Sequence, residues 1–185
     1  MSRIESDFLG SLEIPDDVYY GVQTTRATHN FHITEMSMSQ DAYFPIAFGY
    51  VKKAAAMANK ELGCIPADVA DGLIWACDQL IAGKYRDQFV TDWLQGGAGT
   101  SVNMNCNEVI CNLACEHMGL PKGDKKVSPN DHANFGQSTN DTYPTALHLA
   151  MLLRSNQMLK AVEELVESFY KQAEKNAGVL KMGRT

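Results

Sequence analysis

The feature of this sequence that most constrains its fold is a long helical pattern near the C-terminal end. From Pro144 to about Ala177 the chain contains no glycine and no second proline. At 1.5 Å per residue, this pattern predicts a helix roughly 50 Å long, several times the average in globular proteins. Its apolar side chains form two adjacent seams, one of Met158, Val162, Leu165 and Phe169 and the other of Leu159, Val166, Tyr170 and Ala173.

A helix with two apolar seams needs partners on two sides, as in a helix bundle. No other segment of the 185 residues is long enough to cover both seams. We therefore expect the long helix to be completed by the rest of a longer chain or by neighbouring subunits.

Shorter helices are expected upstream of this pattern. Proline and glycine punctuate them, and apolar residues recur at helical spacing. The predicted segments begin at Pro45, Pro66 and about Ser101, and they end at Gly63, Gly83 and Met118. Residues 1–43 are expected to be irregular with short extended pieces, and residues 119–133 to form a loop. The predicted fold class is mainly α.

Charge and composition exclude several classes of function. A net charge of −6 and a pI near 5.3 argue against nucleic acid or an anionic membrane as the main partner. No stretch approaches the roughly 20 apolar residues of a membrane span, and the acidic start is unlike a secretory signal. The five cysteines lack CxxC spacing. We expect them to be reduced, mostly buried and in a cytoplasmic protein, with a metal site on Cys111 and Cys115 as the alternative.

Two polar turns precede predicted helices and share a design. They read "GGAGTS" at 96–101 and "GQSTND" at 136–141. A helix N-terminus offers free N–H groups and partial positive charge, and glycine lets an anion approach closely. Two such sites would suit a small molecule with two carboxylates. The alternative is that both are ordinary caps, and "GGAGTS" lacks the spacing of a nucleotide P-loop.

The third predicted helix carries an unusual number of asparagines. They are Asn103, Asn105, Asn107 and Asn112. Because asparagine is a poor helix former, some of them are expected to serve as hydrogen-bonding groups.

Several segments, in the same order along the chain, resemble the aspartase/fumarase superfamily. The resemblance is carried by "QGGAGTSVNMNCNEVICN", "SPNDHANFGQSTNDTYPTA" and "LKMGRT". It is extended over essentially the whole chain by "DFLGSLEIPDDVYYGVQTTRATHNF" and "VKKAAAMANKEL". The aspartase branch is favoured because fumarases tend to read GSGTQ at the first turn and to carry histidine where Ser128 stands. Leu12 replaces an arginine of some aspartases, which leaves the role of position 12 open.

The resemblance implies a nearly all-α fold in two parts. Residues 1–140 would form an N-terminal lyase domain with a short irregular or extended start. Residues 141–185 would be the first long helix of a central helix-bundle domain, four copies of which build a homotetramer. The implied reaction is the reversible deamination of L-aspartate to fumarate through an aci-carboxylate intermediate. The resemblance implies no prosthetic group and leaves room for activation by a divalent cation.

The resemblance also assigns residues to the site. Ser138 and Thr139 would cradle the β-carboxylate, and Asn140 would orient the substrate at its amino group. The remaining substrate-binding residues would be Thr100, Thr185 and Arg26. The alternative for Arg26 is that it is only a surface charge. The family's base is a serine in a GSSxMPxKxN loop, which this chain lacks. We therefore expect the 185 residues alone to be inactive. Fumarase and a non-catalytic helical interaction module are the alternative functions.

Overall fold

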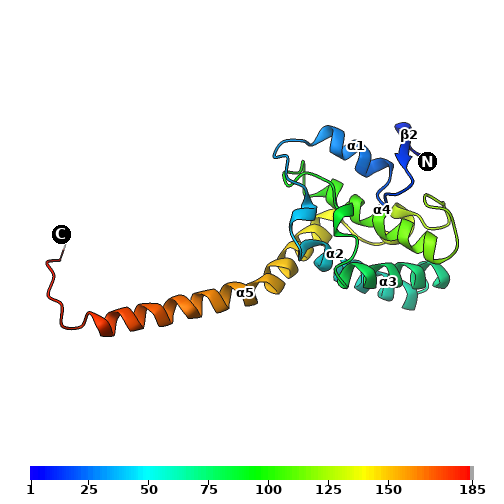
Figure 1. The fold of residues 1–185 in the computed structure, drawn as a ribbon. Coiled ribbons are helices and arrows are strands. Elements are labelled where there is room, and N and C mark those ends of the chain that lie inside the picture. The colour runs from blue at the N-terminus through cyan, green and yellow to red at the C-terminus, as the bar shows by residue number, and fades with distance from the viewer. Residues whose placement is uncertain (184–185) are drawn as a thin grey trace. The chain divides into compact units, whose positions relative to one another are not determined.

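The computed structural model describes residues 1–183 and divides into two compact units, residues 1–150 and the segment from Met151 onward. The first unit begins with an antiparallel hairpin of two strands. Its elements are β1 (Ser2–Asp7), β2 (Gly10–Pro15), α1 (Val22–Asn30), α2 (Phe44–Glu61), α3 (Ala67–Ile81) and α4 (Thr100–His117), followed by the start of α5 (Thr139–Lys175), and Figure 1 shows their order. The fold is mainly α, as predicted, whereas the predicted domain boundary after residue 140 stays a prediction.

Helix α4 forms the centre of the first unit. Every residue from Val102 to Cys115 is buried, with the polar ones included. Helix α3 packs on one side of α4 and on α2, and α1 packs against α4 as well (Figure 1). A helix buried on all faces has to satisfy its polar side chains inside the protein. The asparagines of α4 bond to other segments through their side chains, although Asn107 Oδ1 has no hydrogen-bond partner within the described residues.

The predicted helices α2 and α3 are confirmed to within a few residues. The Asp41 carboxylate accepts hydrogen bonds from the N–H groups of Tyr43 and Phe44, at 2.8 and 2.9 Å, and Pro45 lies in the first turn of α2. At the other end, Gly63 has a φ of +67°, the left-handed conformation that commonly ends a helix. Local signals therefore set these two elements.

Helix α1 corrects the expectation that residues 1–43 are irregular. Its N-cap residue, Gly21, has no side chain to accept a hydrogen bond from the first turn, so the local sequence does not indicate that a helix begins here. The cap comes from α4, where the buried Glu108 carboxylate accepts from the N–H groups of Gly21, Gln23 and Thr24 and from the Thr24 hydroxyl, at 2.6 to 3.0 Å. A cap supplied from 84 residues away is invisible to local pattern analysis.

The segment before α5 also differs from the expected loop. A π-helical turn, η3, spans Pro129–Ala133, and the Ser128 hydroxyl accepts from the Asp131 N–H at 3.1 Å. Helix α5 then begins at Thr139, before Pro144. The Ser138 hydroxyl accepts from the Asn140 N–H at 3.2 Å, so Ser138 rather than the proline sets the start.

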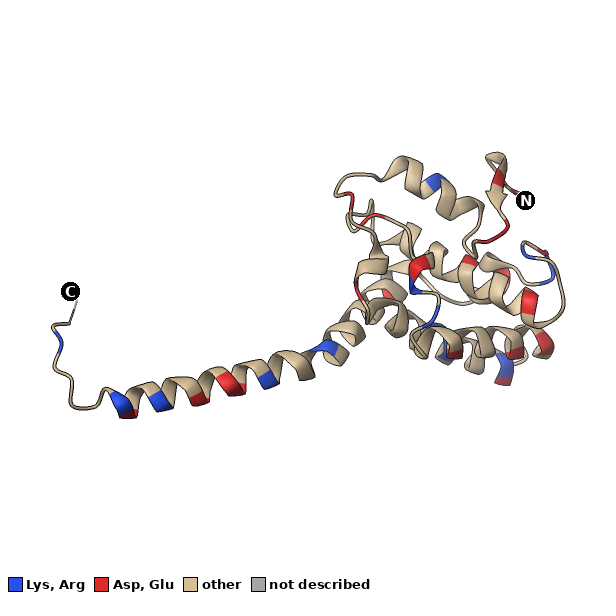
Figure 2. Ribbon diagram, in the orientation of Figure 1, with Lys and Arg blue, Asp and Glu red and all other residues tan. Residues whose placement is uncertain are grey.

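The second unit contains the remainder of α5, and its side chains are almost all exposed. Charged residues of both signs are interspersed along it (Figure 2). Both predicted seams are uncovered within the described residues, with exposed fractions of 43% at Val162 to 71% at Tyr170. Among the helices of residues 1–183, none combines the length and apolar character that crossing a membrane requires.

We predict that replacing Glu108 with alanine destabilises the chain by about 2–4 kcal/mol, because buried donors at the start of α1 lose their acceptor. Urea unfolding of the purified chain would measure this. Glu61→Ala, at an exposed position on α2, is the control and should change stability by less than about 0.5 kcal/mol. Equal effects of the two substitutions would show that Glu108 does not cap α1.

Candidate functional site

The two polar turns lie side by side within the first unit. Asn103, in the first turn of α4, donates from Nδ2 to the Thr139 hydroxyl at 3.3 Å and accepts at Oδ1 from the Thr142 hydroxyl at 3.1 Å. Gly99, the N-cap of α4, is so close to Tyr143 that a Cβ there would lie 2.2 Å from the ring. The structure thus brings together the two helix starts that the sequence suggested separately.

An exposed layer of polar groups covers this junction. Thr100, Ser138 and Asn140 are exposed and Thr139 is half-buried. The first N–H groups of a helix have no intrahelical acceptor. At the N-terminus of α4 the N-cap residue supplies no side-chain acceptor either. Within residues 1–183, the Thr100 hydroxyl and the Asn140 amide make no side-chain hydrogen bond. Donors from two helix starts are therefore available to one anionic ligand.

A layer of buried and half-buried amides supports the exposed layer from below. Asn134 is its centre, because its Oδ1 accepts from Asn103 at 2.9 Å and from Asn107 at 3.2 Å. Asn134 Nδ2 donates to the Gln137 carbonyl at 3.1 Å, and Gln137 Nε2 donates to the Ala133 carbonyl at 2.9 Å. These bonds fix the loop immediately before Ser138.

Asn105 and Asn112 hold segments away from this junction. Asn105 accepts from the Val90 N–H and donates to the Gln88 carbonyl, at 3.1 and 2.9 Å. Asn112 accepts from the Gly123 N–H at 2.6 Å and donates to the Tyr19 carbonyl at 2.8 Å. The sequence marked α4 as a source of hydrogen bonds but could not distinguish the asparagines beside the candidate site from these two.

One predicted substrate-binding residue, Arg26, contacts the N-terminal hairpin rather than the junction. Arg26 on α1 donates to both oxygens of Asp7, at 2.9 and 3.0 Å, and to the Gly10 carbonyl at 3.0 Å. The hydrogen bond from Arg26 lowers the pKa of Asp7. The guanidinium is thus already occupied by a carboxylate of the same chain. Thr185 lies outside the described residues.

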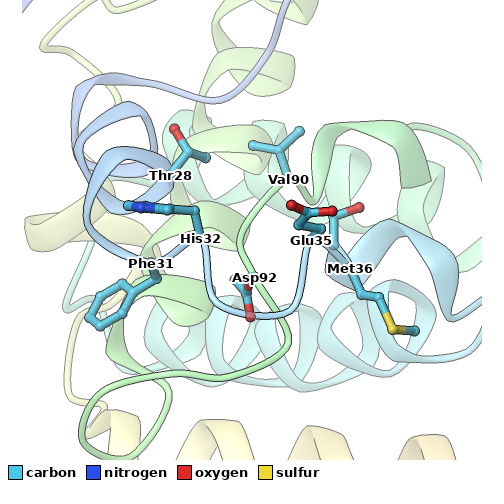
Figure 3. Close-up of a pocket in the computed structure, with 8 residues that line it drawn as sticks. Thr28, Phe31, His32, Glu35, Met36, Val90 and Asp92 are labelled. Atoms are coloured by element: carbon cyan, nitrogen blue, oxygen red, sulfur yellow. The ribbon is translucent and has the colours of Figure 1, made fainter.

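A surface pocket of about 200 Å³ lies elsewhere in the first unit (Figure 3). It is lined by Thr28 of α1, by residues of the segment after α1 and by Val90 and Asp92, and it shares none with the polar turns. Asp92 accepts from the N–H groups of Ile33, Thr34 and Leu94 and from the Thr34 hydroxyl. Burial raises the pKa of Asp92, but these hydrogen bonds outweigh it and lower the pKa to about 2. Its carboxylate therefore holds the loop in place.

The cysteines are free, and all except Cys64 are buried. Burial raises the pKa of the Cys106 thiol to about 12, so this thiol is protonated at neutral pH. In the described part of the chain, no group of histidine, cysteine, aspartate or glutamate side chains is arranged to hold a metal ion.

Comparison with known proteins gives the class to which this fold and site belong. A family model described as Lyase matches residues 10–185. The chain therefore belongs to the lyase family.

Individual relatives narrow the comparison. An aspartate ammonia-lyase from Bacillus sp is 52% identical over 184 residues, covering 99% of this chain and 39% of the relative. The aspartate ammonia-lyase of Escherichia coli (strain K12) is 50% identical, with the same coverage. The chain thus spans about two-fifths of the length of these curated relatives.

Solved structures agree with this assignment. The chain matches the fumarate lyase:delta crystallin of Brucella melitensis in native form with a TM-score of 0.93 and 47% identity, over all of this chain and 43% of that one. A class II fumarase from Schistosoma mansoni matches with a TM-score of 0.87 and 33% identity, over all of this chain and 39% of that one.

We predict that Gly99→Ala disrupts the contact between the starts of α4 and α5. Gly99 has a φ of +80°, and the added Cβ would collide with the Tyr143 ring. Gly97→Ala is the matched control, because Gly97 has a φ of +66° but nothing within 4 Å of the added Cβ. We expect Gly99→Ala to lose about 1–3 kcal/mol more unfolding free energy than Gly97→Ala in urea titrations. Equal losses would mean that the contact with Tyr143 is not required.

Proposed function

We propose that the complete protein containing this chain catalyses the reversible deamination of L-aspartate to fumarate and ammonia. The observation that carries the proposal is the junction of the two helix starts, bridged by Asn103 to Thr139 and Thr142. About 50% identity to proteins named aspartate ammonia-lyase supports the choice of substrate.

The chemistry explains why such a junction suits this reaction. A base removes a proton from C3 of L-aspartate, and the electron pair moves into the adjacent C4 carboxylate, which then carries two negative charges. Expulsion of ammonia from C2 returns that pair to form the C2–C3 double bond. Catalysis therefore depends on stabilising charge that appears only after the proton is lost.

The exposed residues at the junction have separate roles in this proposal. The hydroxyls of Ser138 and Thr139, at the positive end of α5, hold the C4 carboxylate and its developing charge. Thr100 approaches the substrate from the start of α4, and Asn140 orients the amino group. Arg26 takes part only if it exchanges Asp7 for a substrate carboxylate.

The base and the remaining contacts lie outside the described residues in this proposal. A serine in a loop of the GSSxMPxKxN type would remove the proton, and Thr185 would contact the substrate. No prosthetic group takes part. The protein assembles as a homotetramer through its helix bundles, and the exposed apolar seams of α5 support this assembly because such faces are rarely left in water.

Fumarase is the second candidate, because the class II fumarase of Schistosoma mansoni has the same fold over this whole chain. The two activities differ in whether ammonia or water leaves C2, so the substrate separates them.

We predict that the product of the complete reading frame forms fumarate from L-aspartate and not from L-malate, followed as absorbance near 240 nm. The chain of 185 residues alone should form none from either acid. Turnover of L-malate in place of L-aspartate would assign the fumarase reaction. Turnover of neither acid by the complete protein would reject both candidates, and turnover by the short chain alone would reject the proposed base.

We predict that Ser138→Ala and Thr139→Val each lower kcat for L-aspartate by about a hundredfold, because each removes a group at the developing charge. Thr145→Val is the control, since the Thr145 hydroxyl donates to a carbonyl of its own helix on an exposed face. Thermal unfolding should show only small losses of stability, about 1 kcal/mol for Ser138→Ala and Thr139→Val, because each also loses one structural hydrogen bond. A scaffold protein would instead lose stability at Ser138 and Thr139 while any activity stayed the same.

A further inference from the structure

Lys52 is a buried cation with no carboxylate partner in the part of the chain described. It lies on α2, and its side chain is 1% exposed. Its ammonium donates to Gln137 Oε1 at 3.0 Å and to Asn134 Oδ1 at 3.3 Å, both oxygens of neutral amides. The adjacent Lys53 pairs with the Asp78 carboxylate at 2.6 Å.

This arrangement is unfavourable for the folded chain by itself. An ammonium removed from water needs an opposite charge to offset its lost hydration, and two amide oxygens offset only part of it. Burial lowers the pKa of Lys52 to about 8. A buried charge that is unfavourable for folding and lies close to a candidate site indicates a functional role.

The hydrogen-bonded network connects Lys52 to the candidate site. Asn134 Oδ1, which accepts from Lys52, also accepts from Asn103, and Asn103 donates onward to the Thr139 hydroxyl. Gln137, the other acceptor of Lys52, immediately precedes Ser138. The ammonium therefore lies behind the start of α5, separated from the exposed hydroxyls by one layer of amides.

We propose that Lys52 is a positioning residue that gives this site its preference for a doubly ionised ligand. The inference rests on the proposed function, since it assumes that a C4 dicarboxylate binds at Ser138 and Thr139. Lys52 fixes Asn134 and Gln137 beneath the start of α5, and its charge acts through protein rather than through water. Such a charge is screened far less than one on the surface. Its attraction grows with the charge of the ligand.

The test compares two inhibitors that share a carbon skeleton and differ by one charge: succinate, a dianion, and its monoamide succinamate, a monoanion. Inhibition constants are measured at pH 7 with the complete protein and with Lys52→Met. We expect Lys52→Met to weaken the binding of succinate about tenfold and that of succinamate less than about threefold. The reason is that the Lys52 charge attracts both charges of succinate but only the single charge of succinamate. Lys53→Met, which removes a surface charge from the same helix, should change neither constant.

The melting temperature separates this role from a purely structural one. Removing an unpaired buried charge should leave the melting temperature unchanged or raise it. If Lys52→Met weakens both inhibitors equally, or neither, the proposal is overturned while the proposed function stands. If the unmodified protein binds neither inhibitor, the proposed function fails and this inference with it.

A measurement without substitution covers the case in which Lys52→Met does not fold. In the unmodified protein, the ratio of succinate to succinamate affinity should fall several-fold between pH 7 and pH 9, as Lys52 loses its proton while succinate stays a dianion. The groups facing Lys52 are Cys77 on α3 and Cys106 and Cys111 on α4, all thiols held protonated by burial. A ratio that stays constant over this range would overturn the proposal.

Discussion

The site depends on one interaction, the bridge from Asn103 at the start of α4 to Thr139 and Thr142 at the start of α5. A single helix N-terminus attracts an anion only weakly, because its partial charge is small and readily hydrated. Two N-termini at one junction, over a layer of amides and a buried ammonium, combine their fields at one place. The chemistry proposed for this chain requires such a concentration of positive potential.

Helix α4 makes this arrangement possible because it is buried on every face. Its polar side chains therefore bond to other segments rather than to water. Glu108 caps α1, Asn105 and Asn112 hold backbone on either side, and Asn103 and Asn107 meet at Asn134. The same helix thus organises the domain and carries the site.

The sequence predicted much of this structure where the signals were local. Proline and glycine residues predicted where α2 and α3 begin and end. The asparagines of α4 indicated that this helix makes side-chain hydrogen bonds. Helix α1 was missed because its cap is the distant Glu108, and α5 begins earlier than Pro144 because Ser138 starts it. Lys52 was missed too, although its signal was present: it lies four residues from Phe48 and from Ala56, on the buried face of α2.

The central claim is that the two helix starts bind a doubly ionised C4 acid together. The most direct measurement is a crystal structure of the complete protein with succinate bound. The account predicts one carboxylate at the N–H and hydroxyl groups of Ser138 and Thr139, with Thr100 within hydrogen-bond distance of the ligand. Succinate bound only elsewhere, for example in the pocket beside Asp92, with both helix starts empty, would contradict it.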